Sequence, residues 1–442
     1  MKNKINFGFF ALCLTGILIF SACEEKDPRF ENNDNPMEIT AVHLQDGDDD
    51  VTDRTVTFAR LGQLIRLEGK GFFGVKSVYI NGESAYANPT LLSDNSLIVR
   101  VPSTAPTTDA DDDVRNTIVL KKANLNYTYP FEIRESAPSI TNISHTLPQA
   151  GEEITIYGSG LIDITSIVFP GDITVNEGIT FDEEDGKWCK AIVPEGVSED
   201  GGSILVLGAN GGAYSPAYFN CKKHVVHNFD DVNNQSWSGG TISENLSAKI
   251  PTEGVGPKSQ GTYRSLNTPG NTIAADAPKV AYYWAKQNMW GEILNPLIPG
   301  STPCSEVAVQ MDIYVEGVWN SGYIRIVVAD GWGTNRYCML YAPWESFGKR
   351  IPFENPGCWF TITLPFSDSD DWKDGTFADV MTIVQTAVSD KYNQWGPWFD
   401  NDAYNDVAAE ATDAVIYFDN MRIVTLETPA YSDYADEETN VE

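Results

Sequence analysis

The feature that most constrains the fold is an internal repeat in the first half of the chain. Residues 62–72 read GQLIRLEGKGF and residues 151–161 read GEEITIYGSGL, and at the same offset VKSVYING at 75–82 aligns with ITSIVFPG at 164–171. Each copy alternates apolar and polar residues as a strand does, and then turns at a Gly-x-Gly step where glycine accepts a positive φ. The repeat therefore predicts two successive copies of one β-rich fold.

The repeated motifs resemble those of the IPT/TIG immunoglobulin-like domain. The marks are Gly-x-Gly-Phe in the first copy, Gly-x-Gly-Leu in the second, and a strand that ends in Val-Pro in both, at 97–102 and 190–194. The resemblance covers residues 37–222 and implies two β-sandwiches, which we assign to 37–136 and 137–223. Pro170 departs from the Asn-Gly turn of the first copy, and Pro138 predicts a short, stiff junction before the second copy.

The N-terminus has the pattern of an exported lipoprotein. Lys2 and Lys4 precede an apolar run from Phe7 to Phe20 that is too short for an ordinary membrane span. The run ends in Ser21-Ala22-Cys23, which resembles a bacterial lipobox, so residues 1–22 are predicted to be a signal peptide and Cys23 to be lipidated. The acidic, polar stretch 23–36 resembles a lipoprotein surface-export signal and is predicted to be a flexible tether.

Ten of the eleven tryptophans lie between Trp237 and Trp398, and only Trp188 precedes them. Tryptophan offers a broad apolar face and one N–H donor, which suits contact with a sugar ring, although the core of a β-sandwich also consumes aromatic residues. Clusters such as Trp395-Gly396-Pro397-Trp398, set among glycine, proline and polar residues, exceed what a core alone requires. We therefore predict an aromatic, ligand-binding domain over residues 224–427.

This rear domain is predicted to be a larger β-sandwich. Residues 308–315, 324–328 and 359–366 have strand patterns, and the two ends, 225–231 and 415–424, resemble the paired terminal strands of jelly-roll carbohydrate-binding modules. No long helical periodicity is recognised, and the acidic tail 428–442 is predicted to be frayed. The predicted fold class is all-β, with tandem immunoglobulin-like IPT/TIG sandwiches followed by a jelly-roll-like sandwich.

Charge and cysteine content narrow the possible ligands. A net charge of −32 argues against nucleic acid and anionic membrane surfaces and is compatible with neutral polysaccharides. Five cysteines remain outside the signal region and form no disulfide framework, although Cys189 and Cys221 could bridge within one domain. His224 and His227 are interpreted as ordinary surface residues, the acidic runs at 48–50 and 109–113 as solvated loops, and no metal or cofactor is expected.

The order of parts along the whole mature chain resembles that of the surface glycan-binding proteins of Bacteroidetes polysaccharide utilisation loci. The closest resemblance is to the type whose final domain binds xyloglucan or related β-glucans. It implies a monomeric, non-enzymatic protein, lipid-anchored in the outer membrane and facing outward, whose Ig-like domains are spacers. It also implies a SusD-like protein and a TonB-dependent transporter as partners. Xyloglucan, mixed-linkage β-glucan and β-mannan all remain open as the ligand.

The resemblance places platform aromatics just after the first strands of the rear domain and before its middle strand. Trp284, Trp290 and Trp319 are the first-rank candidates, with Tyr283 beside them, and Trp319 is expected to project freely from the loop 316–322. Trp332, Trp395 and Trp398 are second-rank candidates, and Trp359 is assigned to the core. Hydrogen bonds to the sugar are assigned to four polar residues: Asn288, Glu292, Asn320 and Arg336.

Two other functions remain open. A glycoside hydrolase needs two carboxylates at a set separation. Candidate carboxylates are present at Glu292, Glu306, Asp312, Asp330 and Glu345, but in a chain with 62 acidic residues such a pair is expected by chance and does not support an enzyme. No nucleophile, phosphate-binding or zinc motif is present. An adhesin or structural surface protein would keep its aromatics buried instead of aligned on one face.

Overall fold

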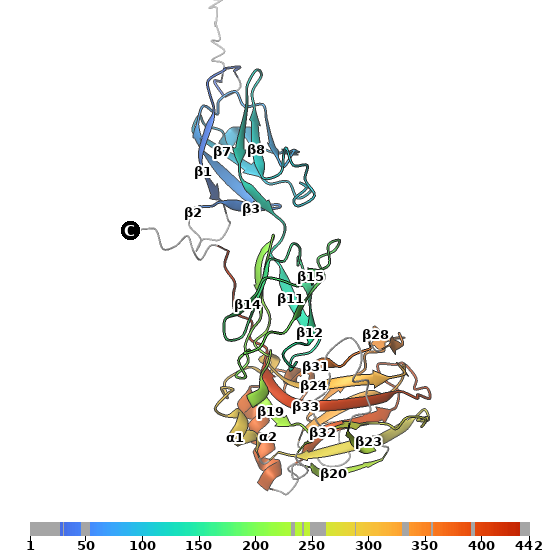
Figure 1. Cartoon of the computed structure of the whole chain (residues 1–442). Coiled ribbons are helices and arrows are strands. Elements are labelled where there is room, and N and C mark those ends of the chain that lie inside the picture. The colour runs from blue at the N-terminus through green and yellow to red at the C-terminus, as the bar shows by residue number, and fades with distance from the viewer. Residues whose placement is uncertain are drawn as a thin grey trace, which may run out of the picture. The chain divides into compact units, whose positions relative to one another are not determined.

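The computed structural model describes residues 27–29, 31–45, 54–230, 235–240, 243–247, 262–287, 289–328, 336–354, 357–389 and 394–433. The chain divides into two compact units, Met1–Glu135 and Ser136–Glu442. Strands predominate in both units (Figure 1), which confirms the all-β prediction. In this part of the chain no helix is long and apolar enough to cross a membrane.

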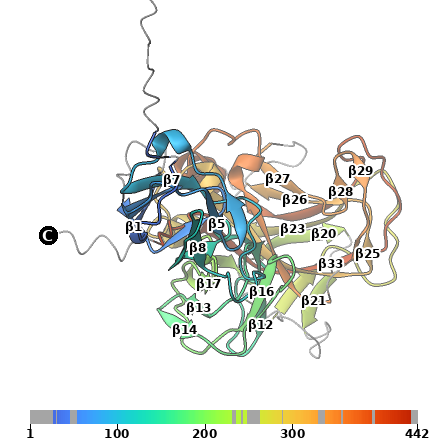
Figure 2. The same ribbon diagram turned by 90° about the horizontal axis from the view of Figure 1, so that it is seen from above.

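The first unit is a sandwich of two four-stranded sheets, β2-β1-β4-β7 and β6-β5-β8-β9, with a short parallel pair β10-β3 beside them. Figure 2 shows β1 and β7 in one layer and β5 and β8 in the other. Its elements are β1 (Glu38–Leu44), β2 (Arg54–Thr55), β3 (Phe58–Arg60), β4 (Leu64–Lys70), β5 (Ser77–Ile80), β6 (Glu83–Ala85), η1 (Pro89–Leu91), β7 (Ser96–Arg100), β8 (Thr117–Lys121), β9 (Asn126–Pro130) and β10 (Glu132–Arg134).

The second Ig-like domain repeats this plan with the sheets β11-β12-β16-β15 and β14-β13-β17-β18. Its strands are β11 (Ser139–Ile143), β12 (Glu153–Ser159), β13 (Ser166–Phe169), β14 (Ile173–Val175), β15 (Thr180–Phe181), β16 (Trp188–Ile192), β17 (Leu205–Gly208) and β18 (Gly211–Tyr214). The repeat in the sequence therefore marks equivalent strands, since β4 and β12, and likewise β5 and β13, are related by the offset of the two copies.

The structure explains both glycines of the repeated Gly-x-Gly step. A Cβ on Gly69 would lie 1.9 Å from the carbonyl oxygen of Glu38, and a Cβ on Gly158 would lie 1.9 Å from that of Ser139, so the first glycine lets the paired strand approach. The second glycine has a positive φ in both copies, +73° at Gly71. Each glycine is thus required by the backbone.

The segment predicted to be a tether is held against the first unit where the structure describes it. The buried Lys122 ammonium donates hydrogen bonds to Asn33 Oδ1 at 2.6 Å and to the Asn35 carbonyl at 2.9 Å. Asn33 Nδ2 donates to the Phe73 carbonyl, and Gly74 N donates to the Arg29 carbonyl. The prediction of a flexible tether is therefore wrong for residues 31–36, because polar side chains and backbone groups are bonded to the domain. Cys23 lies outside the described residues.

The rear domain is a sandwich of two larger sheets. One has the order β21-β22-β33-β24-β31, with β19 also on β33, and the other has the order β20-β23-β32-β26-β27. Their strands are β19 (Val225–His227), β20 (Gln235–Gly240), β21 (Ser243–Ser247), β22 (Thr262–Ser265), β23 (Ala277–Lys286), β24 (Val307–Glu316), β26 (Tyr323–Val328), β27 (Cys338–Tyr341), β31 (Phe360–Pro365), β32 (Gln394–Asn401) and β33 (Val415–Thr425).

Smaller elements join these strands. They are η2 (Lys222–His224), α1 (Trp290–Leu294), η4 (Cys304–Glu306), β25 (Val318–Trp319), β28 (Glu345–Ser346), β29 (Lys349–Arg350), β30 (Phe353–Glu354), η5 (Phe366–Asp368) and α2 (Phe377–Ser389). Figure 2 shows β25 and the hairpin β28–β29 together at one edge of the sandwich.

Closure of the rear domain by its terminal strands is confirmed. β19 pairs antiparallel with β33, with Val225 opposite Arg422 and His227 opposite Met421. The expectation of no long helical pattern is wrong at the 13-residue α2, whose apolar residues Phe377, Val380, Met381 and Val384 follow helical spacing and pack into the core. The helix closes one end of the sandwich (Figure 1).

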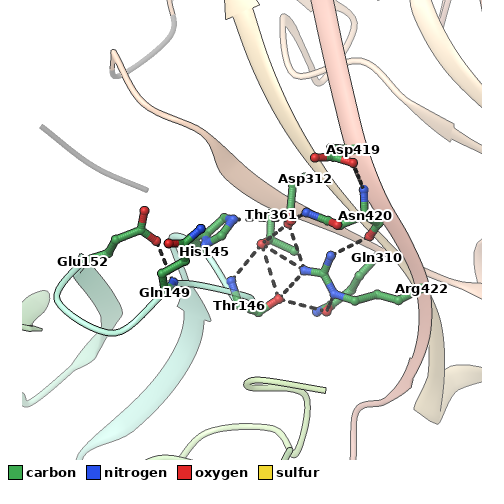
Figure 3. A network of polar contacts seen from close by, with 10 residues as sticks. All are labelled: His145, Thr146, Gln149, Glu152, Gln310, Asp312, Thr361, Asp419, Asn420 and Arg422. Carbon is green, nitrogen blue, oxygen red and sulfur yellow. Dashed lines mark hydrogen bonds and ion pairs between the residues drawn. The ribbon is translucent and has the colours of Figure 1, made fainter. Parts of the chain in front are cut away.

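The second Ig-like domain and the rear sandwich meet at a buried polar network (Figure 3). The turn after β11 places Thr146 against the sheet that contains β24 and β33, on the side of that sheet away from the main core. Thr146 Oγ1 donates to Gln310 Oε1 at 3.2 Å, and Thr146 N donates to Thr361 Oγ1 at 3.0 Å. Arg422 Nη2 donates to Asp312 Oδ1 at 2.9 Å, and both of these side chains are fully buried. These contacts join the two domains as one packed unit.

His145 also lies against this network, with its Nε2 3.3 Å from Asp312 Oδ2. Burial works to raise the pKa of the Asp312 carboxyl, but the charges of Arg422 and His145 outweigh burial and hold that pKa below its usual range. Asp312 is therefore ionised and enclosed, which removes it from the set of carboxylates that a hydrolase could use.

The start of the acidic tail is also packed, on the second Ig-like domain. Ala217 N donates to the Glu427 carbonyl at 2.8 Å, and the rings of Tyr214 and Tyr431 meet edge to face at 6.1 Å. The prediction of a frayed tail is therefore wrong at Tyr431, whose ring packs against Tyr214 of the domain. Residues 434–442 lie outside the described part.

Candidate functional site

The second sheet of the rear sandwich separates the predicted platform residues onto two faces. Successive side chains of a strand point to opposite sides, so neighbours in sequence have different environments. On β23, Tyr283 joins the main core whereas Trp284 belongs to a separate cluster on the other face, and on β32 Trp395 and Trp398 divide in the same way. We call this second face, away from the main core, the outer face.

Four of the predicted platform residues lie in the core. Tyr283, Trp290, Trp319 and Trp395 have exposed fractions of 1%, 0%, 0% and 0%. Trp290 comes from α1 and packs edge to face on Trp395, with ring centroids 4.8 Å apart, and the Tyr283 hydroxyl is 2.9 Å from His227 Nε2. These side chains have no free face for a ligand, so the structure corrects their assignment to a platform.

The expectation that Trp319 projects freely is wrong for a specific reason. The loop after β24 forms the short strand β25, and its pairing with β30 turns the indole inward. Trp319 Nε1 donates to the Gly322 carbonyl at 3.0 Å, and Trp344 Nε1 donates to the same carbonyl at 2.6 Å. Two indoles thus share one acceptor inside the sandwich. Trp359 is 2% exposed, which confirms its assignment to the core.

The outer face brings together two predicted residues, Trp284 and Trp398. Their ring centroids are 5.0 Å apart in an edge-to-face contact with an interplanar angle of 84°, and Tyr282 lies 5.9 Å from Trp398 on the same face. In the register, Tyr282 is opposite Trp398 and Trp398 is opposite Arg325, so the three side chains form a row across three strands. The backbone of Trp237 is opposite Trp284.

Arg325 is the polar member of this row and was not predicted from the sequence. Its guanidinium lies over the Trp398 ring, 5.0 Å from the centroid, and forms a 2.8 Å ion pair with Asp400. Both charged groups are buried, at 5% and 1% exposed. The signal was present in the sequence, since Arg325 is the one charge in the apolar strand Ile324–Val328 and must leave the core face. Tyr282 was not chosen as a site residue, because the sequence alone does not show which residues of the neighbouring strands lie opposite it.

The outer-face aromatics are enclosed in this structure. Trp284 is 3% exposed and Trp398 is 2% exposed, whereas Tyr282 is half-buried and Leu340, at the end of the same row, is 38% exposed. A sugar therefore reaches the two indoles only when the atoms that cover them shift. Arg325 and Trp398 are pre-positioned by the ion pair and the cation–π contact, so a ligand would not have to order them.

The remaining predicted residues do not join this row. Trp332 and Asn288, and among the carboxylates Asp330, lie outside the described residues. Glu292 and Arg336 are exposed, and Arg336 Nη2 pairs with Asp371 at 3.0 Å. The Asn320 carbonyl accepts a hydrogen bond from the guanidinium of Arg350. No hydrogen-bonding role toward a sugar follows from these positions.

His224, His227, Cys189 and Cys221 are all buried. His224 and His227 are 7% and 3% exposed, so their interpretation as surface residues is wrong; burial lowers the pKa of His224, whose Nδ1 lies 2.9 Å from the Ile423 carbonyl oxygen. Cys189 and Cys221 are free thiols, and burial raises their pKa values to about 12 and about 11. In the part of the chain described, no three His, Cys, Asp or Glu residues are grouped to hold a metal.

Comparison with known proteins finds a family model that matches the rear domain and a relative that matches most of the chain. Residues 219–425 match the family model of the surface glycan-binding protein B xyloglucan-binding domain. A Bacteroides ovatus protein described as IPT/TIG domain-containing is 22% identical over 385 residues, which cover 82% of this chain and 69% of that protein.

One solved structure agrees with the fold. The crystal structure of surface glycan-binding protein B from Prevotella bryantii is 20% identical, with a TM-score of 0.65 over 90% of this chain and 100% of that one. The corresponding protein from a complex xyloglucan utilization locus in Bacteroides uniformis is 19% identical over 88% of this chain and 99% of that one, and its TM-score of 0.46 adds nothing to the fold argument.

The fold thus defines a multidomain β-sandwich protein with two Ig-like domains and a larger final sandwich. That final domain is similar to the surface glycan-binding protein B xyloglucan-binding domains, whose family model matches residues 219–425.

Proposed function

We propose that this chain binds a neutral β-linked polysaccharide at the outer face of the rear sandwich and does not cleave it. The observation that carries the proposal is the row Tyr282–Trp398–Arg325, with Trp284 beside it, inside a domain that matches the xyloglucan-binding family. Xyloglucan is the first ligand to test, and mixed-linkage β-glucan and β-mannan remain alternatives.

The chemistry of such a ligand matches the row. A β-1,4-linked glucan is a flat ribbon with apolar C–H faces and hydroxyl edges. Indole and phenol rings bury the C–H faces, at roughly 25 cal/mol per Å² of apolar area, and a guanidinium beside them donates to hydroxyls. Since ordering of ligand and side chains consumes much of this gain, we expect affinity in the micromolar range or weaker. A weak site suits a protein that passes its ligand on.

We also propose the cellular setting: a lipid anchor at Cys23 in the outer membrane, an orientation toward the exterior, and cooperation with a SusD-like protein and a TonB-dependent transporter in polysaccharide capture. The lipobox-like Ser21-Ala22-Cys23 supports the anchor. Replacement of Cys23 by Ser is expected to abolish acyl labelling and release the protein from the outer-membrane fraction. Retention of the label in that variant would contradict the anchor.

An adhesin that binds protein is the second candidate, and one observation favours it. The described platform candidates are 0–3% exposed, as the adhesin hypothesis expects of its aromatics. The match of residues 219–425 to a xyloglucan-binding family outweighs this.

Affinity electrophoresis separates the two functions. The mature protein is run through gels that contain xyloglucan, mixed-linkage β-glucan, galactomannan, xylan or starch, with reducing-sugar release measured in parallel. Retardation by a β-glycan without sugar release supports the binding protein. Free migration in all gels contradicts it and supports the adhesin, and sugar release contradicts the non-enzymatic assignment.

A further inference from the structure

We propose that the first Ig-like domain carries a second polysaccharide-binding site, formed by two grooves on either side of Tyr86. The proposal rests on the proposed function for the class of ligand, but it concerns a different domain and different residues. It assigns the first domain a role in ligand capture in addition to its role as a spacer.

Tyr86 stands at a corner of the first sandwich. It follows β6, the edge strand of one sheet, and its carbonyl accepts a hydrogen bond from Arg100 N in β7, the edge strand of the other sheet, at 3.2 Å. The next residue, Ala87, forms an isolated antiparallel bridge with Val99. The backbone is thus fixed on both sides of the corner while the Tyr86 side chain is 72% exposed. An aromatic ring is therefore held out in solvent on a rigid support.

Grooves of about 450 Å³ and about 470 Å³ flank this ring, and Ser84 and Tyr86 line both of them. The first groove extends under η1, where Leu92 and Leu97 form its apolar floor. The second runs along the end of β7 past Arg100. A ligand that crosses the Tyr86 ring would therefore occupy both grooves, which favours an extended chain over a small compact molecule.

The lining has the mixture that a sugar chain requires. The Tyr86 ring and the apolar floor offer surfaces for C–H faces, and the exposed side chains of Lys76, Ser84 and Arg100 offer hydrogen-bond donors for hydroxyls. Arg100 Nη1 donates to the Gly62 carbonyl at 2.7 Å, which holds the guanidinium against the wall of the second groove. The donor is thus positioned before a ligand arrives.

The same geometry disfavours an extended peptide as the occupant. A peptide that adds to a sheet edge needs free backbone N–H and C=O groups on that edge. At this corner the Tyr86 carbonyl is bonded to Arg100 N, and Ala87 is bridged to Val99. Recognition here must therefore come from side chains, which is how proteins bind a neutral polysaccharide.

The test uses the full mature chain with Tyr86→Ala, alone and combined with Trp398→Ala in the rear domain. Tyr157→Ala is the matched control, because Tyr157 is a tyrosine of the second Ig-like domain that is 41% exposed. Affinity is measured by gel retardation and calorimetry, with xyloglucan polysaccharide and with an oligosaccharide of one xyloglucan repeat. Because Tyr86 is exposed, its loss is not expected to unfold the domain.

We expect Tyr86→Ala to weaken binding of the long polysaccharide by about 3–10-fold, because it removes the second contact of a bivalent interaction. It should leave the rear-domain affinity for the single-repeat oligosaccharide unchanged, and it should remove any binding that remains in Trp398→Ala. If wild type binds xyloglucan and Tyr86→Ala behaves as Tyr157→Ala does in both backgrounds, the second site is refuted and the proposed function stands. If wild type binds no β-glycan, the proposed function fails first.

Discussion

Removal of Arg422 should be the most damaging single truncation at the joint between the second Ig-like domain and the rear sandwich. Its guanidinium is fully buried, pairs with Asp312 at 2.9 Å, and donates to the Asn420 carbonyl at 2.7 Å and to Gln310 Oε1 at 3.2 Å. The Arg422→Ala variant leaves the Asp312 carboxylate buried, without its guanidinium partner and with His145 Nε2 3.3 Å from Oδ2. Breaking a buried pair in this way costs about 3–5 kcal/mol.

The assay is urea and thermal unfolding of the mature chain, followed by far-ultraviolet circular dichroism. At roughly 2–3 °C per kcal/mol for a unit of this size, the predicted loss lowers the melting temperature by about 6–15 °C. Arg336→Ala is the control, because the pair of Arg336 with Asp371 is exposed on the arginine side. An exposed ion pair contributes at most about 1 kcal/mol to the free energy of unfolding, so Arg336→Ala should change the melting temperature little.

A double variant distinguishes a buried charge from lost packing. Replacement of Arg422 by Met together with Asp312 by Leu removes both charges and keeps much of the volume, so it should cost less than Arg422→Ala alone. The reasoning is refuted if Arg422→Ala destabilises the protein by less than about 1 kcal/mol. It is also refuted if the double variant is as unstable as the single one.

Three further predictions concern stability. Because the pKa of Asp312 is lowered in the folded state, its ionised carboxylate stabilises the protein above the unfolded pKa of about 3.9, and this stabilisation is lost as pH falls below that value. In acid titrations followed by circular dichroism, Asp312→Asn should lack this part of the loss of stability. An acid-unfolding profile identical to that of wild type would contradict the prediction. Trp319→Ala should cost about 3–5 kcal/mol in urea unfolding while the folded fraction keeps wild-type affinity in glycan gels, and a selective loss of affinity would return Trp319 to the site. Gly158→Ala should lower the melting temperature more than Gly291→Ala, since a Cβ at Gly158 would lie 1.9 Å from a carbonyl oxygen, whereas a Cβ at Gly291 would meet only Asn295 Nδ2 at 3.5 Å; equal effects would refute the close-approach argument.

The sequence predicted the architecture well because its signals are local and repeated. The glycine steps, the strand patterns at 308–315 and 324–328 and the matching ends of the rear domain depend on neighbouring residues, and they appear as β24, β26 and the β19–β33 pair. The helix α2 was missed although its apolar spacing is visible. The contacts of residues 31–36 and of Tyr431 with the domains were not predictable, because they depend on partners distant in sequence.

The candidate site was predicted less well because it depends on which face of a strand each aromatic occupies. Tyr283 and Trp284 are adjacent and equally aromatic, yet one is in the core and the other on the outer face. The phase of the alternation is set by the pairing of β23 with β32 and by the core on one side of the sheet, and neither is local. Arg325 carried a clue to that phase, because a charge in an apolar strand marks the side away from the core.

The central claim is that the outer face of the second sheet binds glycan, and Trp398→Ala tests it most directly. Trp395→Ala is the matched control, since it removes an indole from the inner face of the same strand. Both variants are checked for folded circular dichroism spectra at the assay temperature and then run through xyloglucan gels. We predict that Trp398→Ala loses retardation, with affinity at least about 30-fold weaker, as for a residue that contributes about 2 kcal/mol, while folded Trp395→Ala is retarded as wild type is. Wild-type retardation of folded Trp398→Ala would contradict the account.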